Sequence, residues 1–164
     1  MVSTRWVKAG LLAVSLLIII IDQWTKQAAE MSLSFGQVVA VFPSFNFQLS
    51  YNTGAAFGML GDAGGWQRIL FSLIAVAIIA SIVFWIIRQH KERVITSLGL
   101  AVILGGAAGN LIDRVAYGHV IDFVLLSWEG NSFPNFNIAD VAINLGALMV
   151  LIGAGGRPKP IAVC

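Results

Sequence analysis

The chain has 164 residues, of which 58% are hydrophobic and only 11% are charged. Its mean hydropathy of +0.86 excludes an ordinary soluble domain and indicates a protein of the lipid bilayer. The formal charge of +2 does not indicate a nucleic-acid partner, because the basic residues lie at the ends of apolar segments, where they act as topology signals. The single cysteine, Cys164, excludes an intrachain disulfide and a cysteine metal cluster.

Four apolar segments predict that 1–164 form a single all-α integral membrane domain with four transmembrane helices. The first span, 7–24, follows a basic N-terminus; it also has features of a secretory signal peptide, although no A-x-A cleavage site follows. The spans 69–87 and 94–112 are uncharged and long enough to cross a hydrocarbon core of about 30 Å. The last span, 137–154, reaches that length when its polar first turn is included.

The segments 25–68 and 113–136, between these spans, are predicted to be extracytoplasmic. The first is long for a helix connection, which indicates that it has structure of its own. Residues 45–52 alternate apolar and polar side chains, and Pro43 and Gly54 mark the two ends. The polar side of this segment consists of Asn46, Gln48, Ser50 and Asn52. We therefore expect a half-buried strand in a small extracytoplasmic β-sheet at the membrane surface.

The distribution of Lys and Arg predicts the orientation of the spans. With the N-terminus inside, seven basic residues are cytoplasmic and three are outside. The cytoplasmic set is Arg5, Lys8, Arg88, Lys91, Arg93, Arg157 and Lys159, and the outer set is Lys26, Arg68 and Arg114. Both termini are then cytoplasmic. The same orientation gathers four carboxylates at the outer face, namely Asp22, Asp113, Asp122 and Asp140.

Carboxylates at membrane depth are candidates for function, because one Asp at a helix centre costs roughly 2.5–3.5 kcal/mol on insertion. Asp22 and Lys26 are four residues apart on the first span. This spacing is also typical of a simple interfacial ion pair, which stabilises a helix end by only about 0.2–0.5 kcal/mol. Both interpretations stay open at this point.

The outer end of the third span combines small and polar residues. Gly105 and Gly109 form a small-xxx-small pair, which predicts the close approach of a neighbouring helix. Asn110, Asp113 and Arg114 share one helix face by their spacing. The two adjacent charged residues cannot face each other well, so we expect each to pair elsewhere, in a structural or substrate-orienting cluster.

Two further acids have no simple structural explanation. Asn137, Asp140 and Asn144 share one face of the fourth span; helix capping accounts for Asn137 but leaves Asp140 unexplained. Asp122 stands in an extended apolar run in the loop before this span, where desolvation raises the pKa of a carboxyl group. If Asp122 and Asp140 meet, one protonated and one ionised, they satisfy the requirement of an aspartic-protease dyad. A proton relay and a structural polar cluster remain alternatives.

Other chemistries fit the residues less well. A zinc protease is not favoured, because there is no HExxH motif and both His90 and His119 stand alone. No metal or other cofactor is predicted, although four aspartates make an all-oxygen cation site conceivable. The rival from another class is a small proton- or ion-coupled membrane transporter subunit, whose acids would be spread through membrane depth. A scaffold that only holds lipidated peptides would need no paired acids.

Five motifs in order along the chain carry a resemblance to a known family: D-Q-W-T-K, N-T-G-A-A-F-G, G-N-L-I-D-R, V-I-D-F and F-N-I-A-D. Together they resemble the bacterial lipoprotein signal peptidases, the type II signal peptidases, over essentially the whole chain. The resemblance implies that Asp122 and Asp140 are the catalytic aspartates. It also implies a set of residues that line or brace the active site: Asp22, Asn52, Gly54, Asn110, Asp113, Arg114, Asn137 and Ala139. We add Lys26 to this set.

The resemblance further implies the substrate and the setting. The expected substrate is a diacylglyceryl-modified prolipoprotein, cleaved just before its lipidated Cys in the bacterial inner membrane by a metal-free aspartyl endopeptidase. Membrane lipid and a globomycin-type inhibitor are further expected partners, and a monomer is expected. The strand over 45–52 could bind the extended substrate backbone by β-augmentation.

Overall fold

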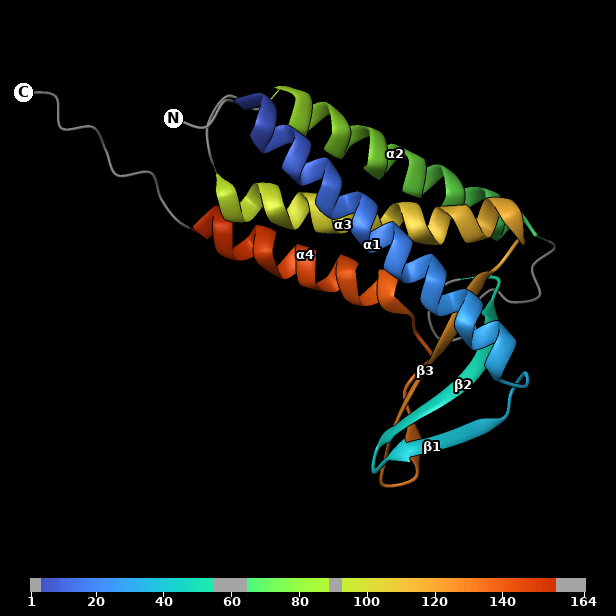
Figure 1. Ribbon diagram of the computed structural model, residues 1–164. Helices are drawn as coiled ribbons and strands as arrows, with labels where there is room; N and C mark the ends of the chain where they lie inside the picture. Colours follow the sequence, from blue (N-terminus) through green and yellow to red (C-terminus); the bar gives the residue numbers. More distant parts are fainter. Residues whose placement is uncertain (1–3, 55–64, 89–92, 156–164) are drawn as a thin grey trace, which may run out of the picture.

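The computed structural model describes residues 4–54, 65–88 and 93–155. Within them the chain forms four helices that are long and apolar enough to cross a membrane. They are α1 (Thr4–Ser32), α2 (Trp66–Arg88), α3 (Val94–Ala116) and α4 (Ile138–Gly155). The helices form one bundle, and a small sheet projects from one end of it (Figure 1). Four membrane-length helices with a small sheet confirm the predicted fold class.

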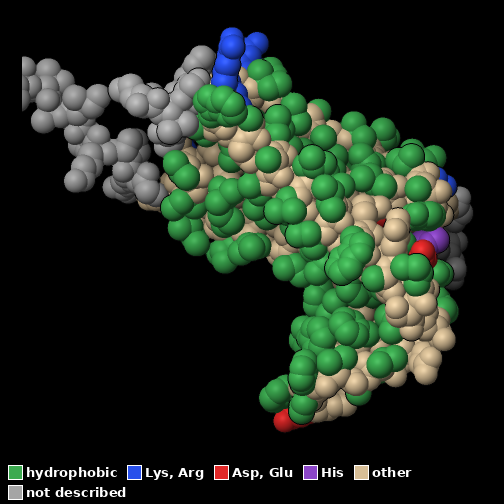
Figure 2. Space-filling view, viewed as in Figure 1, with side chains coloured by type: hydrophobic (Ala, Val, Ile, Leu, Met, Phe, Trp, Pro, Cys, Tyr) green, Lys and Arg blue, Asp and Glu red, His purple; other side chains and the backbone are tan. Residues whose placement is uncertain are grey.

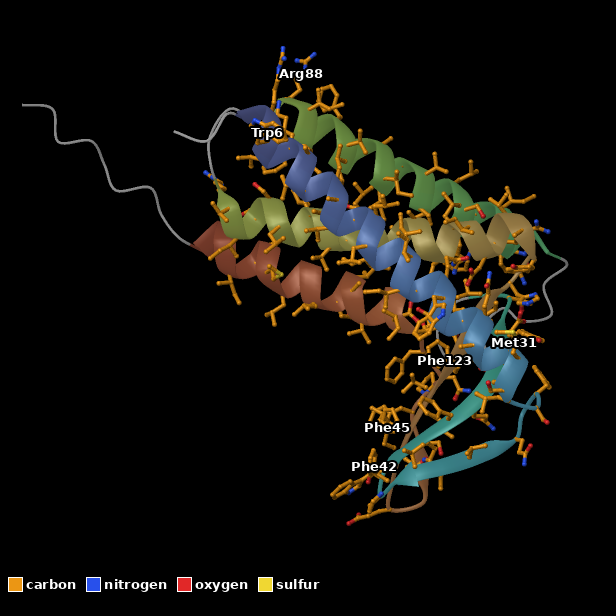
Figure 3. All side chains as sticks on the ribbon, in the orientation of Figure 1. Trp6, Met31, Phe42, Phe45, Arg88 and Phe123 are labelled. Carbon is orange, nitrogen blue, oxygen red and sulfur yellow. The ribbon has the colours of Figure 1, made fainter. Side chains whose placement is uncertain are left out.

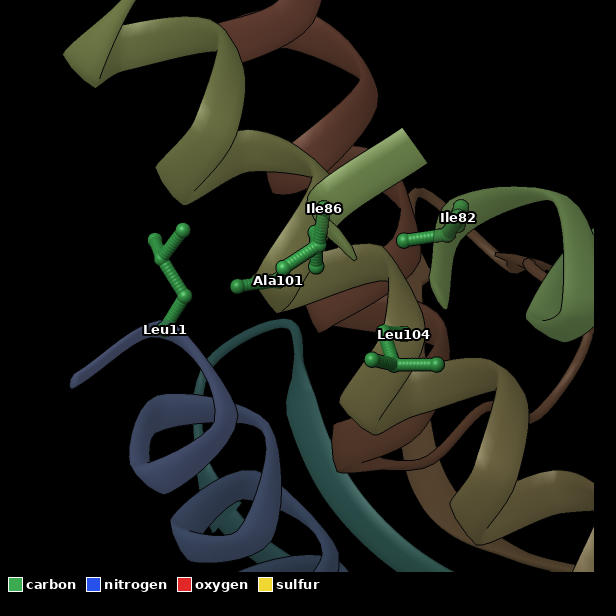
Figure 4. Packing of buried hydrophobic residues seen from close by; sticks show 5 residues of the cluster. All are labelled: Leu11, Ile82, Ile86, Ala101 and Leu104. Carbon is green, nitrogen blue, oxygen red and sulfur yellow. The ribbon is translucent and has the colours of Figure 1, made fainter. Parts of the chain in front are cut away.

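Helix α3 is the centre of the bundle and packs against α1, α2 and α4. Its glycines explain this position. A Cβ atom on Gly105 would lie 2.8 Å from the Ser15 carbonyl of α1, and one on Gly106 would lie 2.5 Å from the Ala139 carbonyl of α4. The close helix approach predicted from the small residues is thus confirmed. On the third side, an apolar cluster joins α3 to α1 and α2 through Leu11, Ile82, Ile86, Ala101 and Leu104 (Figure 4).

The sheet has four antiparallel strands in the order β1-β2-β3-β4. They are β1 (Val38–Phe42), β2 (Phe45–Asn52), β3 (Val120–Trp128) and β4 (Asn131–Ser132). The β3–β4 hairpin turns at Glu129 and Gly130, whose φ angles of 47° and 83° are those of a type I′ turn. Pairing of β2 with β3 joins segments far apart in the sequence and brings Ser50 opposite Asp122.

The strand predicted over 45–52 is confirmed, but its two sides are less regular than the alternation indicates. Leu49 is buried, whereas Tyr51, expected on the same side, is 41% exposed. A register shift between Phe47 and Ser50 causes this difference. The proposed β-augmentation is wrong for the first half of β2, because β1 and β3 occupy both of its edges from Phe45 to Phe47.

Several predicted bounds differ from the structure. Helix α1 continues past residue 24 to Ser32, and α3 continues to Ala116, so that Asp113 and Arg114 lie in its last turn. Asp122 lies on β3 and not in a loop, because the apolar run around it pairs with β2. In each case tertiary packing extends an element beyond the purely apolar segment.

Polar and apolar side chains divide along the molecule. Hydrophobic side chains cover most of the visible bundle surface and the hollow where the sheet meets it (Figure 2). At the end of the bundle away from the sheet lie Trp6 and Arg88, whereas Met31 and Phe123 lie where α1 meets the sheet (Figure 3). At the far end Lys8 Nζ donates to the Ile87 carbonyl at 2.6 Å. The polar residues that the motifs single out all lie at the sheet end.

Candidate active site

A buried lysine holds together the ends of α1 and α3. Lys26 Nζ donates to Asp22 Oδ2 at 2.7 Å and to Asn110 Oδ1 at 2.9 Å, and it forms an ion pair with Asp113 Oδ2 at 2.8 Å. Lys26 is 1% exposed and both aspartates are 0% exposed. Because unpaired charges are costly in such an interior, each of the three charged groups depends on its partners. The ion pair considered for Asp22 and Lys26 is thus present, but it is buried and shared with Asp113, so it is not a simple interfacial pair.

The two aspartates of this cluster also fix neighbouring elements. Asp22 Oδ1 accepts the backbone N–H of Ala139 at 2.9 Å and so holds the first turn of α4. Asp113 Oδ2 accepts the backbone N–H of Ile121 at 3.2 Å and so holds the start of β3. Gly109 leaves room for this arrangement, since a Cβ there would lie 2.5 Å from Asp22 Oδ2. The cluster thereby sets where the fourth helix and the third strand begin.

Gln23 is a member of the site that sequence reasoning missed. Its side-chain amide donates to Asp113 Oδ1 at 2.7 Å and to the Gly109 carbonyl at 3.2 Å. The sequence feature that indicates Gln23 is its place within the D-Q-W-T-K motif, next to Asp22. A polar residue beside an intramembrane acid is a candidate partner for the charged groups on the adjacent helix.

Asn137 and Asp140 form a reciprocal cap at the start of α4. Asn137 Oδ1 accepts the N–H of Asp140 at 3.0 Å, and Asp140 Oδ2 accepts the N–H of Asn137 at 3.2 Å. This is the capping-box arrangement, with Asp in the place of the usual Glu. The capping explanation is thus right for Asn137 and also accounts for one oxygen of Asp140. The other oxygen, Oδ1, accepts the side-chain amide of Asn110 at 2.8 Å.

Asp122 is buried on β3 and is held by two side-chain amides. Asn137 Nδ2 donates to its Oδ1 at 2.7 Å, and Asn52 Nδ2 donates to its Oδ2 at 3.1 Å. Burial, and then the charge of Asp140, raise the pKa of Asp122 to about 7, against smaller lowering effects of the two amides and of Lys26. Asn137 therefore contacts both acids, which brings Asp122 and Asp140 to one place.

Gly54 supports Asn52 at the end of β2. Its backbone N–H donates to Asn52 Oδ1 at 3.1 Å, so the NH2 group of the same amide faces Asp122. Of the predicted N-T-G-A-A-F-G motif, the part from Ala55 to Gly58 lies outside the described residues. The described part serves to orient one amide donor.

Both acids line an open cleft of about 1190 Å³ between the sheet and the helices. Its polar lining includes Gln48, Ser50, Asn52, Asn135, Asn144 and Arg114. Arg114 lies 5.6 Å from the centre of the Phe71 ring, and so faces the cleft, whereas the neighbouring Asp113 turns into the buried cluster. Asn135, which the sequence reasoning missed, donates to the Gln48 carbonyl at 2.8 Å and holds the opposite wall. Phe71, Phe133 and Phe136 add apolar walls, and an open groove with both polar and apolar walls fits an extended peptide.

His119 does not belong to a metal site within the residues that the structure describes. No group of three or more His, Cys, Asp or Glu side chains among those residues could hold an ion. His119 packs against the Tyr51 ring, with 4.3 Å between the ring centres. The cleft itself is lined by carboxyl and amide groups, among them those of Asp122, Asp140 and Asn52.

Comparisons with known proteins agree with this geometry. The family model described as signal peptidase (SPase) II matches residues 14–154. The lipoprotein signal peptidase of Pseudomonas fluorescens is 48% identical over 151 residues, 91% of this chain and 89% of that protein. The one from Acinetobacter baumannii is 47% identical over 141 residues, 86% of this chain and 80% of that protein.

The solved structures add a match of the fold. A bacterial membrane enzyme determined at 2.3 Å resolution superposes with a TM-score of 0.80 at 28% identity, over 92% of this chain and 93% of that one. A second bacterial membrane enzyme, determined at 1.9 Å, gives a TM-score of 0.78. The chain therefore belongs to the signal peptidase II family.

Proposed function

We propose that this chain removes the signal peptide from diacylglyceryl-modified prolipoproteins by cleaving the peptide bond just before the lipidated Cys. Family membership supports this activity and does not favour the transporter considered above. The observation that carries the proposal is the position of Asn137, whose backbone and side chain contact the carboxyl groups of both Asp122 and Asp140 at the wall of one cleft.

Asp122 and Asp140 are the catalytic pair in this proposal. A pKa of about 7 supports Asp122 as the acid that holds a proton at neutral pH. Asp140 accepts two N–H groups, from the Asn110 side chain and the Asn137 backbone, and is the base of this proposal. Asp140 takes a proton from water while the water oxygen attacks the scissile carbonyl carbon, and Asp122 gives its proton to the carbonyl oxygen.

The intermediate then breaks down without a covalent bond to the enzyme. Asp140 gives the proton that it took from water to the leaving nitrogen as the C–N bond breaks, and a hydroxyl group of the intermediate returns a proton to Asp122. These steps release the signal peptide with a free carboxyl group and the lipidated Cys with a free amine. The oxygen of water ends in the carboxyl group, so atoms and charges balance. Neither a metal nor a cofactor is needed for this sequence of steps.

The remaining residues hold this pair or meet the substrate. Asn52, Asn110 and Asn137 donate to the two acids, with Gly54 orienting Asn52. The elements that carry them are held by Asp22, Lys26, Asp113 and the Ala139 backbone. Arg114, at the edge of the cleft, is available to contact polar groups of the substrate.

We place the protein in the bacterial inner membrane as a monomer, with both termini cytoplasmic and the cleft at the outer face. Among the described residues, four basic side chains lie at the helix ends away from the sheet, and this supports the orientation: Arg5, Lys8, Arg88 and Arg93. A diacylglyceryl substrate stays in the bilayer, because each buried CH₂ contributes about 0.8 kcal/mol. A cleft at the end of the spans meets such a substrate without extracting it, and the same cleft would take a globomycin-type inhibitor.

Cleavage of a defined peptide tests the proposed function. The purified protein in detergent is incubated with a synthetic diacylglyceryl lipobox peptide, and the products are measured by mass spectrometry. We expect one cut, directly before the lipidated Cys, and no cut in the same peptide without lipid. Absence of product, or equal cleavage of both peptides, would refute the proposal.

A further inference from the structure

The Lys26 ammonium group has partners on three sides. It carries N–H donors and no acceptor. It donates to Asp22 Oδ2 at 2.7 Å and to Asn110 Oδ1 at 2.9 Å, and it forms an ion pair with Asp113 Oδ2 at 2.8 Å. Two of these partners balance its charge. The third is a neutral amide oxygen, and its contact with a buried cation fixes which end of the Asn110 amide points toward α1.

This contact determines what Asn110 offers to Asp140. The Asn110 oxygen also accepts Asn137 Nδ2 at 3.1 Å, so two donors hold it on that side. The NH2 group must then point the other way, where it donates to Asp140 Oδ1 at 2.8 Å. Asn137 is fixed in the same manner, because its oxygen accepts the Asp140 N–H, and its NH2 group faces Asp122. Each acid thus receives an NH2 group from an amide that cannot turn over.

We infer that Lys26 is a positioning residue of the proposed reaction, which locks the Asn110 amide so that its NH2 group donates to Asp140. Without this cation only Asn137 Nδ2 holds the amide oxygen, and this weaker hold lets the amide rotate and turn its oxygen toward the Asp140 carboxylate. Two oxygens in contact would favour a proton on Asp140, and the reaction would lose its base. The inference rests on the proposed function and adds to it a role for a residue that does not touch the substrate.

Other charged groups lie around this contact. Among the described residues, Arg114 on α3 and Asp122 on β3 interact with Asp140 through their charges, and Asp22, Lys26 and Asp113 form the buried cluster next to Asn110. Replacement of Lys26 removes one positive charge as well as one hydrogen-bond donor. A second variant is therefore needed that changes the amide and leaves the charge of Lys26 in place.

Two variants and a control test the inference by the pH profile of kcat and KM with the diacylglyceryl lipobox peptide. Lys26→Met removes the donor to Asn110. Asn110→Asp keeps an oxygen for Lys26 but replaces the NH2 group that faces Asp140 with a second oxygen. Lys8→Met removes a lysine contact at the far end of α1 and serves as the control. Thermal melts establish which variants are folded.

We expect both active-site variants to move the acidic limb of the kcat profile up by about one to two pH units, the effect of one lost hydrogen bond to a charged group. KM should stay near the wild-type value, and Lys8→Met should leave the limb in place. If Lys26→Met fails to fold, Asn110→Asp decides. If a folded variant has a lower kcat at every pH but its acidic limb stays at the wild-type pH, the inference is overturned. An inactive wild type refutes the proposed function and this role with it.

Discussion

Replacement of Asn52 by Leu should change the pH at which the enzyme loses activity. Asn52 Nδ2 donates to Asp122 Oδ2 at 3.1 Å, and this contact lowers the pKa of Asp122, which nevertheless stays raised at about 7. Asn52→Leu removes the donor and places an apolar group beside the carboxyl. Both changes disfavour the charged form, so the pKa rises further.

The size of the shift follows from one hydrogen bond to a charged group. Such a bond is worth about 1.5–3 kcal/mol, and one pKa unit corresponds to about 1.4 kcal/mol, so the pKa should rise by about one to two units. Protonated Asp122 is the active form in our account. Activity is present below its pKa and is lost as pH rises through it, so the basic limb should move from near 7 to about 8–9.

The assay is the pH dependence of kcat for the diacylglyceryl lipobox peptide, measured in detergent. Because the two carboxyl groups interact, the limb reports the pair and not one residue. Gln48→Leu is the matched control, since Gln48 lines the cleft from the same strand but makes its hydrogen bonds with Asn135 and the Gly36 carbonyl. A basic limb that stays in place or moves to lower pH in Asn52→Leu would refute the reasoning.

Two further predictions concern stability, each measured by thermal unfolding in detergent. Gly109→Ala should lower the melting temperature, because its Cβ would lie 2.5 Å from Asp22 Oδ2, whereas Gly10→Ala, with no atom within 4 Å, should not. An unchanged melting temperature for Gly109→Ala would contradict the packing. Asp22→Ala should cost about 3–5 kcal/mol by leaving Lys26 short of a partner, and the exposed Glu30→Ala in the same helix should cost little. Equal losses in both variants would count against the buried cluster.

The helices and one strand could be predicted because their signals are local. Long uncharged runs identify α2 and α3, and strict alternation identifies β2. Strand β3 is harder to predict from the sequence. Both of its faces are buried, so apolar and polar side chains do not alternate along it. The bulge in β2 follows from its pairing with β3, which no pattern within β2 reveals.

The sequence indicates the members of the candidate site but not their connections. The cost of an acid among apolar residues marks Asp22, Asp113, Asp122 and Asp140 as candidates, and the family resemblance selects the last two as the catalytic pair. Which partner each polar group takes depends on how α1, α3 and β3 meet, so the links through Lys26 and Asn137 required the structure. The spacing of Asn137 and Asp140 fits a capping box, yet it does not show that the same asparagine also reaches Asp122.

Cleavage by the single variants Asp122→Asn and Asp140→Asn tests the central claim most directly. Each amide keeps the size of the acid but cannot take up or deliver the proton that the reaction requires. We predict that both variants insert and melt as folded proteins while product from the diacylglyceryl lipobox peptide falls to background. Near-normal processing by either purified variant would contradict the account.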